Sequence, residues 1–376
     1  MSVETENMMD SAVTIALEDV PCPRCGGGES VVIHRCLDYI YGVPGEFFAS
    51  RCTACGLWFQ NPRPVLAQLA DLYPVSYGPY HTNASAAASP AVRSGLAERL
   101  SHFKETLRQI SWLRQLRRGW AQGYLVHYLG YRQFGGQTSL EHLAGRLGAA
   151  LSLSSRWSAC VDLVPHFVAD GRLLEVGSGN GERLVQLRDM GWRHLHGVEL
   201  SETSAAASRE MGFDVMAGTI EDVLAHYPDN HFDVIVSAMV VEHLVNPFTT
   251  MRSIATKLKP GGELLFSTVI RDSADGWIFG QYGVSYDFPR HMVFFKKEDL
   301  LGMLKADFEG TECCHQCTPI DFTRPARLRG KWFDAWIANF FRLPGSRLLV
   351  KLLARLNLMG RVSIRCRRRV AANGGM

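Results

Sequence analysis

The chain has 376 residues, which is enough for two or three compact units at about 150 residues each. Hydrophobic residues make up 47% of it, charged residues 20%, and the formal net charge is +3, a balance that excludes wholesale disorder and a fibrous chain. No apolar run approaches the roughly 18 to 20 residues of a membrane-spanning helix. The first twenty residues carry five acids and no Lys or Arg, unlike a secretory signal, so we expect a cytoplasmic protein.

Residues 1–20 are expected to form an acidic tail, and two Cys-x-x-Cys-Gly turns follow it. The four cysteines of these turns are Cys22, Cys25, Cys52 and Cys55. Thiolates at this spacing are typical of a tetrahedral zinc site, and cysteines in an intracellular chain favour metal binding over disulfides. Residues 60–64 are expected to be a turn, because prolines disfavour both helix and sheet. We therefore predict a zinc ribbon over residues 21–64, with a structural Zn²⁺ whose four protein ligands leave no open position.

Residues 65–160 are expected to hold a linker and a helical lid. The linker around 85–90 is rich in Ala and Ser. Between Arg93 and Trp120, apolar residues recur every three or four positions, which predicts a helix, and this helix also carries several basic residues.

From residue 161 onward, short β-type runs alternate with helical spacers. The runs lie at 172–176, 195–199, 213–216, 232–237, 263–269, 308–317 and 362–369. Strands separated by helices imply right-handed crossovers and a mostly parallel sheet with helices on both faces. We predict an α/β core over residues 161–320, followed by a basic helical segment and a last strand in residues 321–376.

The sharpest motif is the glycine loop Gly177-Ser178-Gly179-Asn180-Gly181, which follows the first of these strands and opens a helix. Glycines let the backbone turn sharply and let a ligand come close to it. Glu199 ends the next strand, where a carboxylate can accept hydrogen bonds from ribose hydroxyls. Glu175, just before the loop, would repel a pyrophosphate but suits a cationic amino group. The ligand that fits is a nucleoside bearing an amino acid.

With these motifs the chain resembles the class I S-adenosylmethionine-dependent methyltransferases, whose core is a Rossmann-like, seven-stranded sheet. The similar segments are 173–181, 197–201, 217–222, 232–237 and 258–265, in the family's order. The resemblance implies S-adenosylmethionine as cofactor. The residues it assigns to the cofactor are Glu175, Gly177, Gly179, Gly181, Glu199, Thr219, Ile220 and Ser237. Relatives often have an Asp at the position of Thr219, so here backbone groups of Thr219 and Ile220 are expected to contact adenine.

Two histidines are candidates for a general base, which helps methyl transfer when the acceptor is a hydroxyl or a carbon acid. His243 follows the fourth strand, and its alternative role is to position a loop or pack against the adenosine. His291 lies in an aromatic stretch with Trp277, Phe279, Tyr282 and Tyr286, and its alternative role is that of a turn residue. Glu242 could orient His243 or help to hold a divalent ion.

A zinc ribbon ahead of such a core resembles a bacterial subgroup that acts in surface-glycan and natural-product pathways. This implies a small-molecule, sugar or lipid-linked acceptor, methylated on oxygen. The first alternative is a sugar C-methyltransferase, although those relatives carry a large C-terminal domain for which there is no room after residue 320. The second is a zinc-ribbon adaptor that binds the cofactor or RNA without turnover. Nucleic acid is disfavoured as a substrate, because residues 237–240 read Ser-Ala-Met-Val and lack the Pro-Pro-aromatic motif of base-amino methyltransferases.

The C-terminal part is strongly basic, with thirteen Lys or Arg and one acid, Asp334, between residues 324 and 369. In the predicted helix 347–356, Arg347, Lys351 and Arg355 share one stripe and leucines occupy the other. Such a helix can lie on an anionic membrane or bind a phosphorylated acceptor. The alternative is a solvated cationic face held to the core by its leucines.

Overall fold

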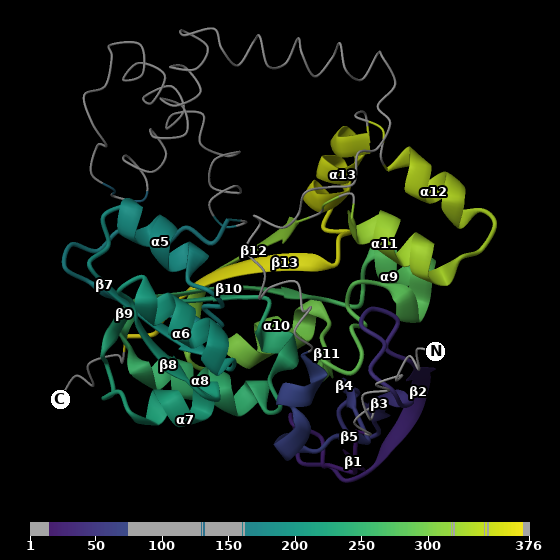
Figure 1. The fold of residues 1–376 in the computed structure, drawn as a ribbon, viewed down its shortest axis with the longest axis horizontal. Helices are drawn as coiled ribbons and strands as arrows, with labels where there is room; N and C mark the ends of the chain where they lie inside the picture. Colours follow the sequence, from purple (N-terminus) through teal and green to yellow (C-terminus); the bar gives the residue numbers. More distant parts are fainter. Residues whose placement is uncertain are drawn as a thin grey trace, which may run out of the picture.

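The structure is a computed structural model that describes residues 15–73, 162–316, 320–341 and 346–370. It also describes the single residues Leu129, Tyr131, Cys160, Thr318 and Leu343. The predicted helix at 93–120 and most of the predicted lid lie outside the described residues. Figure 1 shows the central sheet with the N-terminal unit, in purple, beside one of its ends.

Seven strands form the central sheet, in the order β12-β13-β10-β9-β6-β7-β8. Their bounds are β6 (Arg172–Val176), β7 (His194–Glu199), β8 (Asp214–Ala217), β9 (Phe232–Ala238), β10 (Leu258–Val269), β12 (Phe308–Gln316) and β13 (Arg361–Arg368). The pairs from β8 to β10 are parallel, and β13 runs antiparallel to both β10 and β12. The predicted seven-stranded, mostly parallel α/β sheet is therefore confirmed, and every predicted run falls on one of its strands.

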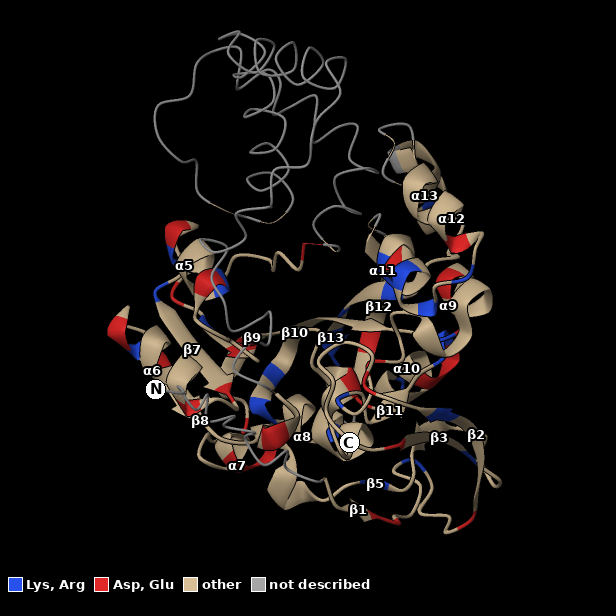
Figure 2. Cartoon of the chain, turned by 45° about the vertical axis from the view of Figure 1, so that its right-hand side comes forward, with Lys and Arg blue, Asp and Glu red and all other residues tan. Residues whose placement is uncertain are grey.

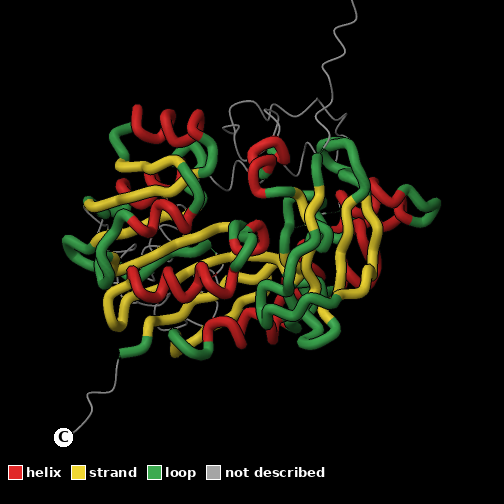
Figure 3. Tube along the Cα trace, turned by 90° about the horizontal axis from the view of Figure 1, so that it is seen from below, coloured by secondary structure: helices red, strands yellow, loops and turns green. Residues whose placement is uncertain are grey.

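Helices cover both faces of this sheet, which is why its inner strands are apolar on both sides. In β9, the run Val234-Ile235-Val236 is fully buried. One face packs on α5 (Glu182–Asp189) and α6 (Glu202–Glu210), and the buried residues there form one cluster. The other face packs on α7, α8 and α10, which share a second cluster with the N-terminal unit. Their bounds are α7 (Ile220–Ala225), α8 (Pro247–Lys257) and α10 (Lys297–Leu304). Figure 3 shows strands and helices in these layers.

The N-terminal unit is a small antiparallel sheet that the core completes. Its order is β11-β4-β3-β2, with the bounds β2 (Ser30–Cys36), β3 (Phe47–Cys52), β4 (Trp58–Gln60) and β11 (Val293–Phe294). Because β11 comes from the core, the ribbon and the core share a sheet. Two expectations are wrong here. Leu17–Glu18, placed in the tail, form β1, and they pair with β5 (Arg63–Pro64), which was expected to be part of a turn. Strands β1 and β5 are only two residues long and pair only with each other. They tolerate the proline, because Pro64, which has no backbone N–H, does not have to continue a longer ladder of hydrogen bonds.

A helical unit lies on the same side of the molecule as the N-terminal unit, above it in Figure 1. Its helices are α9 (Ala274–Phe279), α11 (Ile320–Arg329), α12 (Asp334–Phe340) and α13 (Ser346–Arg355). They share a small core in which Phe322 and Phe341 stack with their ring centroids 4.0 Å apart. Four 3₁₀ turns complete the described elements, η1 (Leu66–Gln68), η2 (Ala70–Leu72), η5 (Val241–His243) and η6 (Gly280–Tyr282). Among the described residues, no helix is both long and apolar enough to cross a membrane.

Candidate functional site

A cleft of about 760 Å³ opens beyond the carboxyl ends of the parallel strands. The strand order reverses between β6 and β9, and ligands of open α/β sheets bind at such a switch point. Several residues selected from the sequence line this cleft, namely Gly177, Gly179, Glu199, Thr219, Ile220, His243 and His291. Glu175, Gly181 and Ser237 are not part of the lining. Residues far apart in the chain thus meet at one site.

The turn after β6 needs glycine for two reasons. Gly177 has a φ of +74°, in the left-handed region that favours glycine. A Cβ built on it would lie 2.5 Å from Cγ2 of Val240, so any side chain there would collide with the opposite wall. The loop is therefore a cradle of bare backbone, open to the cleft.

Glu199 fixes this cradle to the end of β7. One carboxylate oxygen accepts a hydrogen bond from the Gly179 N–H at 2.8 Å, and the other accepts one from the Ser201 N–H at 2.9 Å. The residue is buried yet still lines the cleft. Its position is thus set by the backbone of both loops, and an acceptor for ribose hydroxyls fits at this edge.

Glu175 lies deeper than the sequence suggested. Its carboxylate forms an ion pair with Nε of Arg183 at 3.2 Å, and its Oε2 is buried with no hydrogen-bond partner in the described part of the chain. Burial raises the pKa of Glu175 to about 8, against the lowering effect of Arg183. Contact between this carboxylate and a cationic amino group remains a prediction.

Thr219 caps α7 with its side chain. Its hydroxyl accepts a hydrogen bond from the Asp222 N–H at 3.2 Å and donates to the Asp222 carboxylate at 2.6 Å. These bonds occupy the hydroxyl, which leaves backbone groups of Thr219 and Ile220 to contact a base; that contact with adenine remains a prediction.

His243 and His291 form a close pair in the cleft. Their ring centroids are 4.7 Å apart in an edge-to-face arrangement. Nδ1 of His243 lies 3.1 Å from the carbonyl oxygen of Arg290, and Nδ1 of His291 lies 2.9 Å from that of Ser285. Because a carbonyl oxygen only accepts, these contacts assign the proton to Nδ1 in each ring and leave Nε2 unprotonated.

Burial disfavours the protonated, cationic form of both imidazole rings. It lowers the pKa of His243 to about 4, and the neighbouring His291 adds to this effect. The pKa of His291 is lowered for the same main reason. Both histidines are therefore neutral near pH 7, and His243 is the more exposed of the two. Each ring is therefore available as an unprotonated acceptor at neutral pH, and the same burial makes it a weaker base than an exposed histidine.

Glu242 lies behind the pair and is fully buried. Its carboxylate accepts a hydrogen bond from the Thr268 hydroxyl at 2.6 Å. Ligand atoms of Glu242, His243 and His291 lie within 4.8 Å of one another, so these three side chains could also hold a divalent ion. Orienting His243 and helping to hold a divalent ion both remain predictions for Glu242.

Arg290, which the sequence analysis did not single out, ties the histidine loop to the ribbon. Its two terminal nitrogens donate to both carboxylate oxygens of Asp38 at 2.9 Å each, and its Nε donates to Asp287 at 3.0 Å. It also donates to the carbonyl of Leu72 and lies over the ring of Tyr41. No part of the Arg290 side chain is exposed. A single buried guanidinium therefore sets the position of the loop that carries His291.

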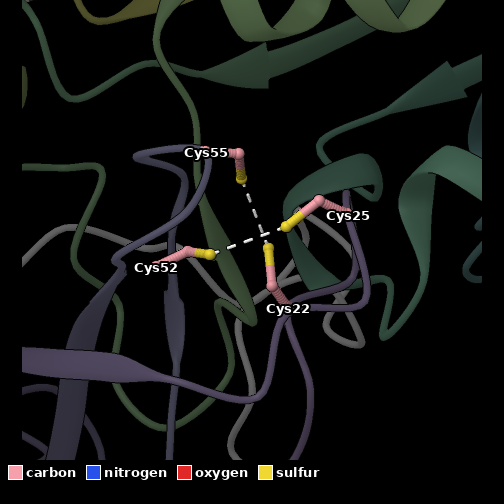
Figure 4. Close-up of side chains that lie close together, drawn as sticks. All are labelled: Cys22, Cys25, Cys52 and Cys55. Carbon is pink, nitrogen blue, oxygen red and sulfur yellow. Dashed lines mark hydrogen bonds between the residues drawn. The ribbon is translucent and has the colours of Figure 1, made fainter.

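The four ribbon cysteines converge on one point, as Figure 4 shows. The Cys22–Cys55 and Cys25–Cys52 sulfur pairs are each 3.6 Å apart, and all four sulfurs lie within 4.8 Å of one another. Zn–S bonds of about 2.3 Å in a tetrahedron place sulfurs roughly 3.8 Å apart, whereas a disulfide needs about 2.05 Å. Each turn is closed by a glycine N–H, from Gly26 to Cys22 O and from Gly56 to Cys52 O. The donor set fits a structural zinc ion.

We expect one zinc per chain, measured by elemental analysis of the purified protein. Cys52→Ser should remove most of the zinc and lower the thermal midpoint, because a structural metal contributes folding free energy. Cys313→Ser is the control, since this half-buried thiol is not part of the cluster. A second metal equivalent that His291→Asn abolishes would assign an ion to the Glu242 group. A zinc-free, stable wild type would refute the ribbon site.

Some residues of the cleft carry no local sequence signal. Tyr39 comes from the ribbon, Tyr73 follows η2, Arg324 lies in α11 and Arg361 begins β13. Only the tertiary structure brings them beside the histidines. Of the aromatic residues expected around His291, Tyr282 and Tyr286 line the cleft. Two others do not, because Trp277 is exposed on α9 and Phe279 packs in the core of the helical unit.

The strand order, the glycine turn after β6 and the acid that ends β7 agree with what the sequence motifs predicted for a class I methyltransferase domain. Residues 152–311 match the model of a protein family described as a methyltransferase domain. The matched residues are those whose motifs resemble the class I S-adenosylmethionine-dependent methyltransferases.

Known proteins resemble this chain over part of its length. A ubiquinone biosynthesis O-methyltransferase of Saccharophagus degradans is 30% identical over 125 residues, which cover 32% of this chain and 52% of that protein. One from Idiomarina loihiensis is 29% identical over 148 residues, 36% of this chain and 60% of that protein. The chain thus spans little more than half the length of these relatives. A SAM-dependent methyltransferase structure from Archaeoglobus fulgidus has a TM-score of 0.41 and 18% identity, covering 57% of this chain and 93% of that one.

Proposed function

We propose that this protein transfers the methyl group of S-adenosylmethionine to an oxygen atom of a small molecule bound in the cleft. The observation that carries the proposal is that the glycine cradle, Glu199 and the histidine pair line one cavity. Relatives named O-methyltransferases support oxygen as the receiving atom. The direct test is transfer of labelled methyl groups to a panel of hydroxylated small molecules, with the product analysed by NMR. A methyl group on carbon would favour the C-methyltransferase alternative.

Different residues serve the cofactor end and the acceptor end of the cleft. The glycine cradle, Glu199 and the backbone at 219–220 would hold the cofactor, which supplies an activated methyl group when bound. The neutral His243 accepts the proton of the acceptor hydroxyl at Nε2, while its Nδ1–H stays bonded to the Arg290 carbonyl. The surrounding walls exclude water and align the acceptor for in-line attack.

The walls around the histidines indicate the kind of acceptor. Aromatic side chains dominate this end, contributed by Tyr39, Tyr73, Tyr282, Tyr286 and Phe288. Such walls favour a flat or apolar acceptor body, including the lipid-linked class. Sugar acceptors are also retained, since tyrosine hydroxyls can bond to them.

Glu199→Ala should weaken the binding of S-adenosylhomocysteine by at least about tenfold, since a carboxylate that bonds ribose hydroxyls contributes roughly 1.5 to 3 kcal/mol. The measurement is isothermal titration calorimetry. Glu202→Ala is the matched control, because Glu202 is exposed on α6 and does not line the cleft. If the wild type does not bind S-adenosylhomocysteine, the proposed methyltransferase activity is wrong. Tight binding without turnover on any acceptor would favour the adaptor alternative.

We also propose that α12 and α13 contact an anionic membrane. The leucine stripe of α13 was an alternative packing face, yet Leu348 is 76% and Leu352 is 52% exposed. Of the stripe, Leu353 packs against the core of the helical unit, next to the buried Val350 and Ala354. Trp332, just before α12, and Trp336, within it, are 84% and 75% exposed. Figure 2 shows α12 and α13 mainly in tan, the colour of uncharged residues.

Charge supports lipid as the occupant of this surface. Lys331, which precedes α12, and Lys351 and Arg355 of α13 are exposed. Tryptophan together with basic residues is typical of interfacial helices. We expect salt-sensitive sedimentation with phosphatidylglycerol vesicles and none with phosphatidylcholine. The double variant Trp332→Ser/Trp336→Ser should reduce binding to the phosphatidylglycerol vesicles about tenfold. Val31→Ser, which removes an exposed apolar side chain from the ribbon instead, should not reduce it. If the tryptophan variant binds the vesicles as well as Val31→Ser does, the proposed membrane contact is wrong.

A further inference from the structure

One cation in the cleft, Arg324, has no counter-ion among the described residues. Arg324 of α11 is half-buried and lines the cleft, and within the described part of the chain it forms no hydrogen bond or ion pair. Its nitrogens are not among the buried atoms that lack a hydrogen-bond partner, so the guanidinium faces the open cleft. An anionic group of a ligand bound in the cleft can therefore reach it.

The neighbouring acids are already engaged. Asp321, one helical turn before Arg324, binds Nε of Arg361 at 2.7 Å through one carboxylate oxygen. Its other oxygen accepts hydrogen bonds from Thr318, at 2.8 Å from the N–H and 3.1 Å from the hydroxyl. Asp287 is bound by Arg290. Asp321 and Asp287 are thus taken up by other groups, while Glu242, which lies behind the pair and outside the lining, keeps one carboxylate oxygen without a hydrogen-bond partner among the described residues.

Arg361 adds a second guanidinium to the same region. It lines the cleft, and only its Nε faces Asp321, while one terminal nitrogen lies 3.8 Å from the sulfur of Met239. Arg324 is close enough to His291 for its charge to add to the burial that lowers the pKa of that histidine. Two arginines therefore lie at the acceptor end, beside the proposed base. The remaining acids of the lining, Glu199, Glu221 and Asp222, belong to the cofactor end.

We propose that Arg324, assisted by Arg361, binds an oxyanion of the acceptor, a carboxylate or a phosphate, and holds the hydroxyl to be methylated toward the histidine pair. The fork of a guanidinium matches the two oxygens of either group. This inference rests on the proposed function for the place of the acceptor, and it narrows the acceptor to an anionic class.

The test is calorimetry with three probes, catechol, 3,4-dihydroxybenzoate and phenyl phosphate, on protein saturated with S-adenosylhomocysteine. We expect at least one anionic probe to bind the wild type about tenfold more tightly than neutral catechol. The tighter of the two anions identifies carboxylate or phosphate as the recognised group. Arg324→Gln should reduce the preference to less than about threefold. Arg327→Gln is the matched control, since Arg327 is exposed on the same helix and does not line the cleft.

Two results would overturn the proposal: equal affinity of the wild type for catechol and both anions, or an anion preference that survives in Arg324→Gln. The same titrations without S-adenosylhomocysteine separate this proposal from the proposed function. If the nucleoside fails to bind but the anion preference persists and needs Arg324, the anion site stands and the methyltransferase proposal fails. If the nucleoside binds and no anion preference exists, only the anion site is wrong.

Discussion

Arg290→Met is expected to lower the free energy of unfolding by about 3 to 5 kcal/mol, because it leaves buried carboxylates without their partner. Asp38 and Asp287 both bond to this guanidinium. Although burial opposes it, the bonds from Arg290 hold the pKa of Asp38 below its usual 3.8, and nearby His291 and Arg290 do the same for Asp287. Urea denaturation of the zinc-loaded protein, followed by circular dichroism, measures the change.

The pH dependence has a definite sign. A carboxylate whose pKa is lowered by folding stabilises the protein above the unfolded value, near 4, and this stabilisation is lost as the pH falls below it. The difference between wild type and Arg290→Met should therefore be full at pH 7 and shrink below about pH 4. Arg35→Met is the control, since its ion pair with Glu46 is 3.8 Å long and exposed, and should cost under about 1 kcal/mol. A loss below that value for Arg290→Met would show that the ribbon and the histidine loop do not depend on this contact.

His243→Asn is expected to lower kcat by about 10² to 10⁴ on any acceptor that the wild type methylates on oxygen. Asparagine can still donate to the Arg290 carbonyl but has no basic nitrogen, so the loop should keep its structure. The dissociation constant of S-adenosylhomocysteine should stay within about threefold, because the nucleoside contacts lie at the other end of the cleft. Steady-state kinetics and calorimetry measure the two effects.

The pH profile distinguishes a base from a packing residue. With a pKa near 4, His243 is unprotonated at neutral pH, so the rate should fall only as the pH drops toward 4. A histidine with the ordinary value of 6.5 would lose activity much earlier. His194→Asn, an exposed histidine at the start of β7, should leave kcat unchanged. If His291→Asn loses more activity than His243→Asn, the base is the deeper histidine.

The sequence by itself determined the class of fold and the cofactor end of the site. Local patterns are sufficient there, since a β-type run such as 232–237 specifies a buried strand and the spacing of glycines specifies a turn that no other residue tolerates at Gly177. The cysteine turns are equally local, because two short segments supply all four ligands. In each of these cases the chemistry lies within a few consecutive residues.

The tertiary structure alone decided the acceptor end. Asp38 and Arg290 are separated by 252 residues, and so nothing in either segment indicates that they share a buried ion pair. Arg324 and Arg361 reach the cleft because α11 and β13 pack around it, although the sequence presented them as part of one basic segment. Burial also decided which groups are charged, since solvent exclusion sets the pKa of Glu175 and His243. Long-range packing and desolvation are properties of the folded chain, which is why residue patterns do not carry them.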